Sequence, residues 1–241
     1  MGRLFKAELK KLRSLNIWWL VIAGGTLPTI ITYLTLYNKE GVEWLRFINM
    51  SLLSFNVQSL LTFATFATYM WAREQEENMV ELVWCYPFPR FYLVLVKLIV
   101  LFLVIVVTAA FFFFTTMIVA RGMFETMIPE ELLWKLIKTI LHTGTMHFLL
   151  VPMYMCIAIV TKISISGLIF GIINMCICMA LSHTGMVQYI PQCIPYVMGD
   201  HLLGVNSMVI DHSLWVYYSI TVGVFVISLS VTKVLVDRLK K

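Results

Sequence analysis

Charged residues are scarce in this chain of 241 residues. Only 13% of the residues are charged, 60% are hydrophobic, and the mean hydropathy is +0.87. A water-soluble domain carries about 25% charged residues, so this composition excludes an ordinary soluble protein and predicts an integral membrane protein. The net charge of +5 is better explained by orientation in a membrane than by nucleic-acid binding, because no stretch combines a basic groove with a soluble fold.

Cysteine and the common catalytic motifs are equally sparse. The five cysteines are odd in number, scattered through apolar runs and never spaced as C-x-x-C, which argues against a disulfide framework and a zinc site. His142 and His147 are five residues apart on one expected helix and would point about 140° apart, so no metal site is expected. Neither G-x-x-x-x-G-K-[ST] nor G-x-S-x-G occurs. We therefore expect a non-catalytic chain that holds no cofactor of its own.

Long runs without charge dominate what is present. They predict an all-α integral membrane protein with a single transmembrane domain, residues 1–241, and six membrane spans of about 20 residues or more. The remaining segment, 188–212, is too polar to span and too apolar for a free loop, so we expect a re-entrant or surface-lying helix pair there. The spans are expected at residues 16–37, 48–71, 93–120, 140–160, 165–187 and 213–235.

The first fifteen residues have the pattern of an amphipathic helix. Leu4, Phe5, Leu9, Leu12 and Leu15 recur at helical spacing, and the intervening positions are rich in lysine and arginine. Such a helix is expected to lie at an anionic cytoplasmic leaflet.

Segment 72–91, between the second and third spans, is the most distinctive stretch of the chain. Its acidic residues recur at three- and four-residue spacing, and an apolar group falls on another face. Pro87 and Pro89 would then end the helix. The pattern predicts a coupling helix that docks a partner, whereas the plainer alternative is a solvated loop that only connects two spans. The acidic residues are Glu74, Glu77 and Glu81, and the apolar ones are Met79, Leu82 and Val83.

The basic residues predict the orientation. Six spans would place both termini on one side, and 13 of the 18 lysines and arginines fall on that side, together with segment 72–91. The positive-inside rule therefore predicts a multi-pass protein of the cell membrane with both termini in the cytoplasm.

These features together resemble the membrane permease subunit of a type-2 ABC exporter, in the bacitracin-resistance and lantibiotic-immunity branch. The resemblance covers nearly the whole chain and rests on an ordered signature and a family-like opening, Glu8-Leu9-Lys10-Lys11-Leu12. The signature comprises Arg73-Glu74, Glu76-Glu77, Glu81-Leu82, Pro87, Arg90 and Lys97.

The resemblance implies that two permeases pair, as two copies or with a paralogue, and that each docks a separate ATP-binding subunit, which carries ATP and Mg. The coupling contacts would be Glu74, Glu77 and Glu81 for charge, Met79, Leu82 and Val83 for apolar packing, and Arg90 beyond them. The cargo in this branch is an antimicrobial peptide, bacitracin- or lantibiotic-like, whose export gives resistance or self-immunity.

Three amides inside the expected spans, Asn56, Gln58 and Asn174, are candidates for a substrate path along the dimer interface. Ordinary hydrogen bonding between helices is the competing explanation for each. An alternative function, a secondary transporter or channel without an ATPase, would call for ionisable groups at mid-membrane and a repeat. Neither stands out in the sequence.

Overall fold

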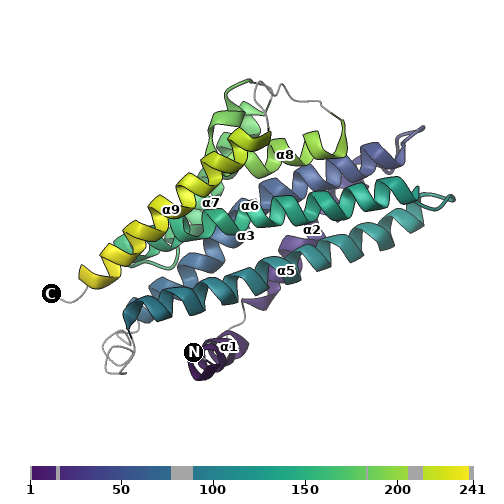
Figure 1. The fold of residues 1–241 in the computed structure, drawn as a ribbon. Coiled ribbons are helices and arrows are strands. Elements are labelled where there is room, and N and C mark those ends of the chain that lie inside the picture. The colour runs from purple at the N-terminus through teal and green to yellow at the C-terminus, as the bar shows by residue number, and fades with distance from the viewer. Residues whose placement is uncertain (1, 15–16, 77–88, 183, 206–213, 239–241) are drawn as a thin grey trace.

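The fold is an elongated bundle of helices, seen in a computed structural model (Figure 1). The structure describes residues 2–14, 17–76, 89–182, 184–205 and 214–238, and every regular element within these residues is a helix. We refer to the end of the bundle that carries α1 as the proximal end and to the opposite end as the distal end.

Five of the described helices are long and apolar enough to cross a membrane. Each follows from a run with few charged residues, in which an α-helix satisfies every backbone group internally. Three of the five extend beyond the predicted spans at both ends, because these helices continue past the apolar runs into charged sequence. The first lies within its predicted span, and the last extends beyond its span only at the C-terminal end. The five helices are α2 (Trp18–Leu36), α3 (Trp44–Glu76), α5 (Arg90–Met123), α6 (Glu130–Thr161) and α9 (Leu214–Arg238).

The predicted fifth span is shorter than expected, so the count of six spans is not confirmed. Helix α7 (Ser166–Leu181) has 16 residues, which is about 24 Å against a hydrocarbon core of about 30 Å. Ser182 and Thr184 donate hydroxyl hydrogen bonds to the carbonyls of Met179 and Leu181, at 2.8 and 2.9 Å. These bonds occupy carbonyls that a longer helix would use, and the helix ends there.

The segment predicted to lie between the last two spans turns back into the bundle. Two short 3-10 turns, Val187–Tyr189 and Pro191–Cys193, lead into α8 (Ile194–Leu203). Helix α8 packs against α3 and α6, with Val197, Met198 and Asp200 fully buried. The segment therefore contributes one inserted helix in its described part, and residues 206–212 lie outside the described residues.

Helix α3 is the central element, because α2, α6, α7 and α8 all pack against it. Its tightest contact is with α7, at two glycines spaced as G-x-x-x-G. A Cβ on Gly167 would lie 2.5 Å from the carbonyl oxygen of Ala64, and one on Gly171 would lie 2.7 Å from the Cα of Leu61. Only glycine allows the two backbones to approach this closely.

Helix α2 uses glycine in the same way. A Cβ on Gly24 would lie 2.7 Å from Thr62 Oγ1 on α3, and one on Gly25 would lie 2.6 Å from the Cβ of Phe111 on α5. These two glycines, together with the buried Pro28, are therefore packing residues rather than a hinge.

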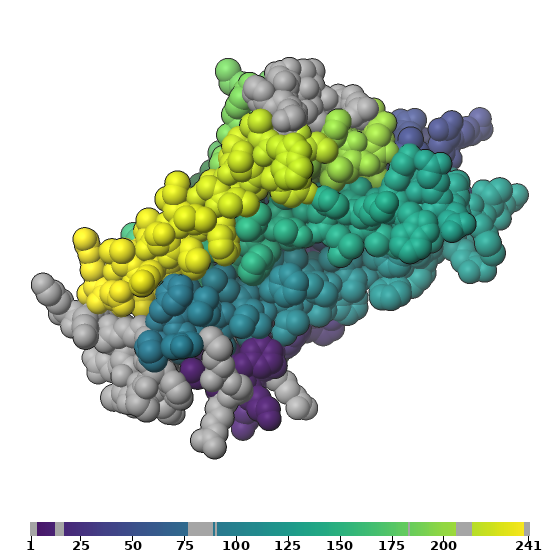
Figure 2. Space-filling view, in the orientation of Figure 1, coloured from purple at the N-terminus to yellow at the C-terminus, as the bar shows by residue number. Residues whose placement is uncertain are grey.

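The N-terminal helix was predicted as residues 1–15 and is observed as α1 (Gly2–Ser14). It lies at the proximal end beside the start of α5 (Figure 2). Leu12 is fully buried, and Phe5 and Leu9 pack against the same apolar cluster. The apolar stripe of this helix is thus covered, at least in part, by the bundle itself.

The α3–α7 contact generates a stability prediction. Gly171→Leu forces a side chain against the backbone of α3, and such overpacking costs about 1–3 kcal/mol. We expect the unfolding temperature of the purified protein in detergent to fall by about 5 °C. Gly223→Leu is the control, because a Cβ at Gly223 on α9 meets nothing within 4 Å. Equal unfolding temperatures for the two variants would contradict the close contact.

Candidate functional site

Four charged side chains meet at the proximal end and form what we call the charge cluster: Glu8, Lys11, Glu74 and Lys97. Lys97 Nζ lies 3.0 Å from Glu74 Oε1 and 3.6 Å from Glu8 Oε2. Lys11 Nζ lies 2.7 Å from Glu74 Oε1 and 2.9 Å from Glu8 Oε1. Two cations thus alternate with two carboxylates, and the cluster joins α1, the end of α3 and the start of α5.

Lys97 is the least exposed member, with 1% of its surface accessible. Besides the two carboxylates, its ammonium group donates a hydrogen bond to the carbonyl of Met70, at 2.7 Å, and lies 5.0 Å from the centre of the Trp71 ring. An ammonium group loses several kcal/mol of hydration on burial, and only close partners of opposite charge compensate for it. Four partners on α1 and α3 therefore hold Lys97, and they fix where α5 begins relative to those helices.

Lys11 forms the outer edge of the cluster. Burial works to lower the pKa of Lys11, but the carboxylates of Glu74 and Glu8 outweigh it and raise the pKa above its ordinary value. A raised pKa keeps the ammonium group charged throughout the neutral range, so its contacts are lost only as the pH rises through that elevated pKa. The bond between α1 and α3 is therefore insensitive to pH changes near neutrality.

A second contact ties the end of α3 to the turn between α6 and α7. Glu76 Oε1 accepts a hydrogen bond from the backbone N–H of Ser164, at 2.7 Å, and the hydroxyl group of Ser164 donates to Glu76 Oε2. The turn itself contains Lys162 in the left-handed region, with φ of 58°. The last turn of α3 is thereby connected to four other elements: α1, α5, α6 and α7.

Two of the seven predicted coupling residues flank a gap in the described residues, and the other five lie within it. Glu74 is a member of the charge cluster. Arg90 opens α5, directly after Pro89 and three residues before the predicted start of the third span, although its side chain is outside the described residues. The other predicted coupling residues lie within 77–88, also outside the described residues: Glu77, Met79, Glu81, Leu82 and Val83.

The three amides predicted for a substrate path do not share one site. Asn56 is buried, and its Oδ1 lies 3.3 Å from Nε2 of His147 on α6. Gln58 is two residues further along α3 and so points to nearly the opposite side. Asn174 donates to the carbonyl of Phe170 on its own helix, at 2.7 Å. The geometry of Asn56 and Asn174 is that of hydrogen bonding within the bundle, and their role in transport stays a prediction.

Sequence reasoning missed a buried polar contact near the distal end. Asp200 on α8 is fully buried and accepts a hydrogen bond from Nδ2 of Asn49, at 3.0 Å. Asn49 and Asn56 are seven residues apart on α3, so both point to the face that α6 and α8 cover. The seven-residue spacing of Asn49 and Asn56 was the feature of the sequence that could have indicated a polar contact on this face of α3. Within the described ranges, no three histidine, cysteine or acidic side chains are grouped to hold a metal ion.

The charge cluster generates a second stability prediction. Lys97→Met removes the buried cation and leaves Glu8 and Glu74 to share Lys11, so the cluster carries an excess negative charge. Breaking a buried ion pair in this way costs about 3–5 kcal/mol. We expect the unfolding temperature to fall by about 10 °C and α1 to become sensitive to protease. Lys135→Met is the matched control, because the partner of Lys135, Glu131, is 81% exposed and such surface pairs contribute about 1 kcal/mol or less. Equal losses in the two variants would refute the structural role of Lys97.

Comparison with known proteins agrees with this arrangement of long helices. The sequence profile of the ABC-2 family transporter proteins matches residues 4–180, from α1 to the last turn of α7. Comparison with curated proteins finds no matching sequence. Because the profile covers well over half of the 241 residues, the chain belongs to the ABC-2 family of transporter proteins and is a multi-pass membrane permease of an ABC exporter.

Proposed function

We propose that this permease is driven by a separate ATP-binding subunit that docks on segment 72–91. The observation that carries the proposal is the charge cluster, which joins α3 and α5, the two helices that flank that segment. Glu74 precedes the segment's central part, Lys97 follows it, and their side chains are 3.0 Å apart. A force on residues between them is therefore delivered to α3 and α5 together.

The length of these helices supports the mechanism. Helix α3 has 33 residues and α5 has 34, so each extends about 50 Å and reaches through the whole bundle. A rigid helix transmits a displacement of its proximal end to its distal end, and hinge or rocking motions of this kind are common in transporters. The Glu76–Ser164 contact extends the same displacement to the turn between α6 and α7.

The partners follow from the same proposal. ATP and Mg are held by the ATP-binding subunit, and the ABC-2 family implies such a partner and often a paired permease. We infer that two permeases pair, either as two copies or with a paralogue. The proximal end would face the cytoplasm, because the described termini, the described flanks of segment 72–91 and most of the described lysine and arginine residues belong to that end.

We further propose an antimicrobial peptide, bacitracin- or lantibiotic-like, as the cargo, exported to give resistance or self-immunity. This rests on the resemblance of the segment around Glu74 and Lys97 to that branch of permeases. A secondary transporter or channel remains the alternative, and it differs in one measurable respect, since it would work without an ATPase.

Charge reversal tests the docking segment. If Glu77 and Glu81 face a basic groove on the ATPase, Glu77→Lys with Glu81→Lys brings like charges together across a partly desolvated contact, at a cost of several kcal/mol. We expect the tagged variant to insert normally but to lose the ATP-binding subunit on co-purification, together with ATP hydrolysis and peptide resistance.

The matched control is Glu40→Lys with Glu43→Lys, the same change of charge at two exposed positions of the distal loop. This variant should retain the partner. If both variants behave alike, the effect is one of net charge, and segment 72–91 is a connecting loop.

Orientation is tested separately by labelling single cysteines in a cysteine-free background. Glu125→Cys lies in the exposed distal loop and Lys162→Cys in the exposed proximal turn. A membrane-impermeant maleimide added to intact cells should label the first and not the second, whereas both should react after lysis. The reverse pattern would place the proximal end outside the cell. Cys193 would be a poor reporter, because it is fully buried.

A further inference from the structure

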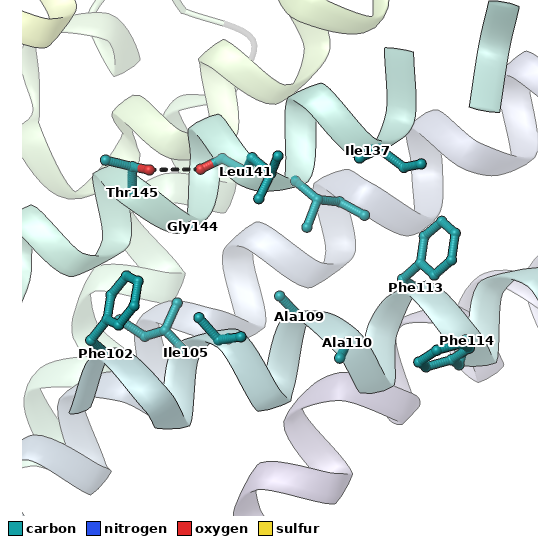
Figure 3. Close-up of a pocket in the computed structure, with 12 residues that line it drawn as sticks. Phe102, Ile105, Ala109, Ala110, Phe113, Phe114, Ile137, Leu141, Gly144 and Thr145 are labelled. Carbon is teal, nitrogen blue, oxygen red and sulfur yellow. Dashed lines mark hydrogen bonds between the residues drawn. The ribbon is translucent and has the colours of Figure 1, made fainter. Parts of the chain in front are cut away.

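A long apolar groove runs between α5 and α6 (Figure 3). Its cavity volume is about 440 Å³, within the range of about 300–1,000 Å³ that is typical of small-molecule sites. Ile105 and Gly144 approach each other within it, and a Cβ on Gly144 would lie 3.8 Å from Cγ2 of Ile105. Phe113, Phe114 and Leu141 line its more distal part.

The groove has about the length of one lipid chain. On α5 its lining extends from Phe102 to Phe114, which is about 18 Å along the helix axis. That is close to one leaflet, half of a hydrocarbon core of about 30 Å. The lining on α5 lies within its apolar run, and the lining on α6 begins at Ile137, beside Lys138, and continues into the apolar run. The material that meets most of the groove in a membrane is therefore acyl chain.

Basic side chains lie at and beyond the distal end of this groove. Lys138 directly follows Ile137, the most distal lining residue on α6, and Arg121 lies seven residues, about 10 Å, beyond Phe114, the most distal lining residue on α5. Seven residues are nearly two full turns, so Arg121 leaves α5 in nearly the direction of Phe114. Both are exposed. Trp134 precedes Leu141 by the same interval and is 55% exposed. An exposed tryptophan next to long basic side chains is the usual arrangement at the level of the lipid headgroups.

The two charges near the distal end of the groove are not neutralised by the protein. Among the described residues neither Arg121 nor Lys138 has an ion-pair partner, whereas the neighbouring Lys135 pairs with Glu131 at 2.8 Å. Two cations without an ion-pair partner among the described residues therefore lie near the distal end of an apolar groove that has about the length of an acyl chain.

We propose that this groove binds one phospholipid of the distal leaflet, with an acyl chain between α5 and α6 and an anionic headgroup at Arg121 and Lys138. The charges favour an anionic headgroup over a zwitterionic one by about 1 kcal/mol for each basic residue. A second copy of the chain is a poorer occupant, because stable protein interfaces bury about 800 Å² on each partner and a narrow groove does not present such a surface.

Native mass spectrometry of the full chain in detergent tests the proposal, with dioleoylphosphatidylglycerol and dioleoylphosphatidylcholine as probes. The unaltered protein should retain one phosphatidylglycerol and bind it more tightly than phosphatidylcholine. Arg121→Gln with Lys138→Gln should weaken phosphatidylglycerol binding about tenfold or more and abolish the preference, since two charges are removed. An unchanged preference would overturn the headgroup assignment.

A second pair of variants tests the chain site. Gly144→Trp fills the groove, while Gly223→Trp adds the same side chain to open space on α9. The first should lose the retained lipid and the second should keep it. Equal lipid retention in the two variants would overturn the proposal. It would also be overturned if Gly144→Trp kept the lipid but no longer gave the mass of a dimer, since the groove would then bind a second copy of the chain. If Gly144→Trp fails to insert, the result for the Arg121 and Lys138 pair decides.

Discussion

The buried charge of Lys97 constrains the whole proximal end. An ammonium group that is 1% exposed has to be surrounded by acceptors, and here Glu8, Glu74 and the carbonyl of Met70 surround it. Each partner belongs to α1 or α3, so the position of α5 is fixed relative to both. The N-terminal helix is thereby part of the same unit as the helix ends that flank segment 72–91. A smaller, apolar side chain at position 97 would allow these three elements to separate.

Much of the fold is predictable from sequence, because membrane helices follow from long uncharged runs. The boundaries were less accurate where charged residues belong to a helix. The predicted fourth span began at residue 140, whereas α6 begins at Glu130. Pro129 followed by Glu130 and Glu131 is a favourable helix start, since proline fixes φ and acidic groups stabilise the N-terminal turn. The predicted span was limited to the uncharged run, so it did not include this helix start. The predicted fifth span extended to residue 187, whereas α7 ends at Leu181, where the polar Ser182 and Thr184 bond back to the last turn.

The candidate site could be predicted only as a set of separate residues. Glu74 and Lys97 were both noted as parts of a signature, but their pairing depends on how α3 and α5 pack, and sequence spacing does not determine that. The same applies to Asn56 and His147, which are 91 residues apart and 3.3 Å from each other. By contrast, the Gly167-x-x-x-Gly171 spacing was readable in advance as a close-packing motif.

The two sides of the bundle differ in how they can respond to a displaced proximal end. Where α3 meets α7, a Cβ at Gly167 or Gly171 would lie within 2.7 Å of the α3 backbone, so the two helices have no room to move closer and should move together. Between α5 and α6 there is instead a groove of about 440 Å³, whose contents can rearrange. We therefore expect movement that is delivered through Glu74 and Lys97 to be taken up mainly between α5 and α6. A lipid in that groove would then fill the part of the bundle that changes shape.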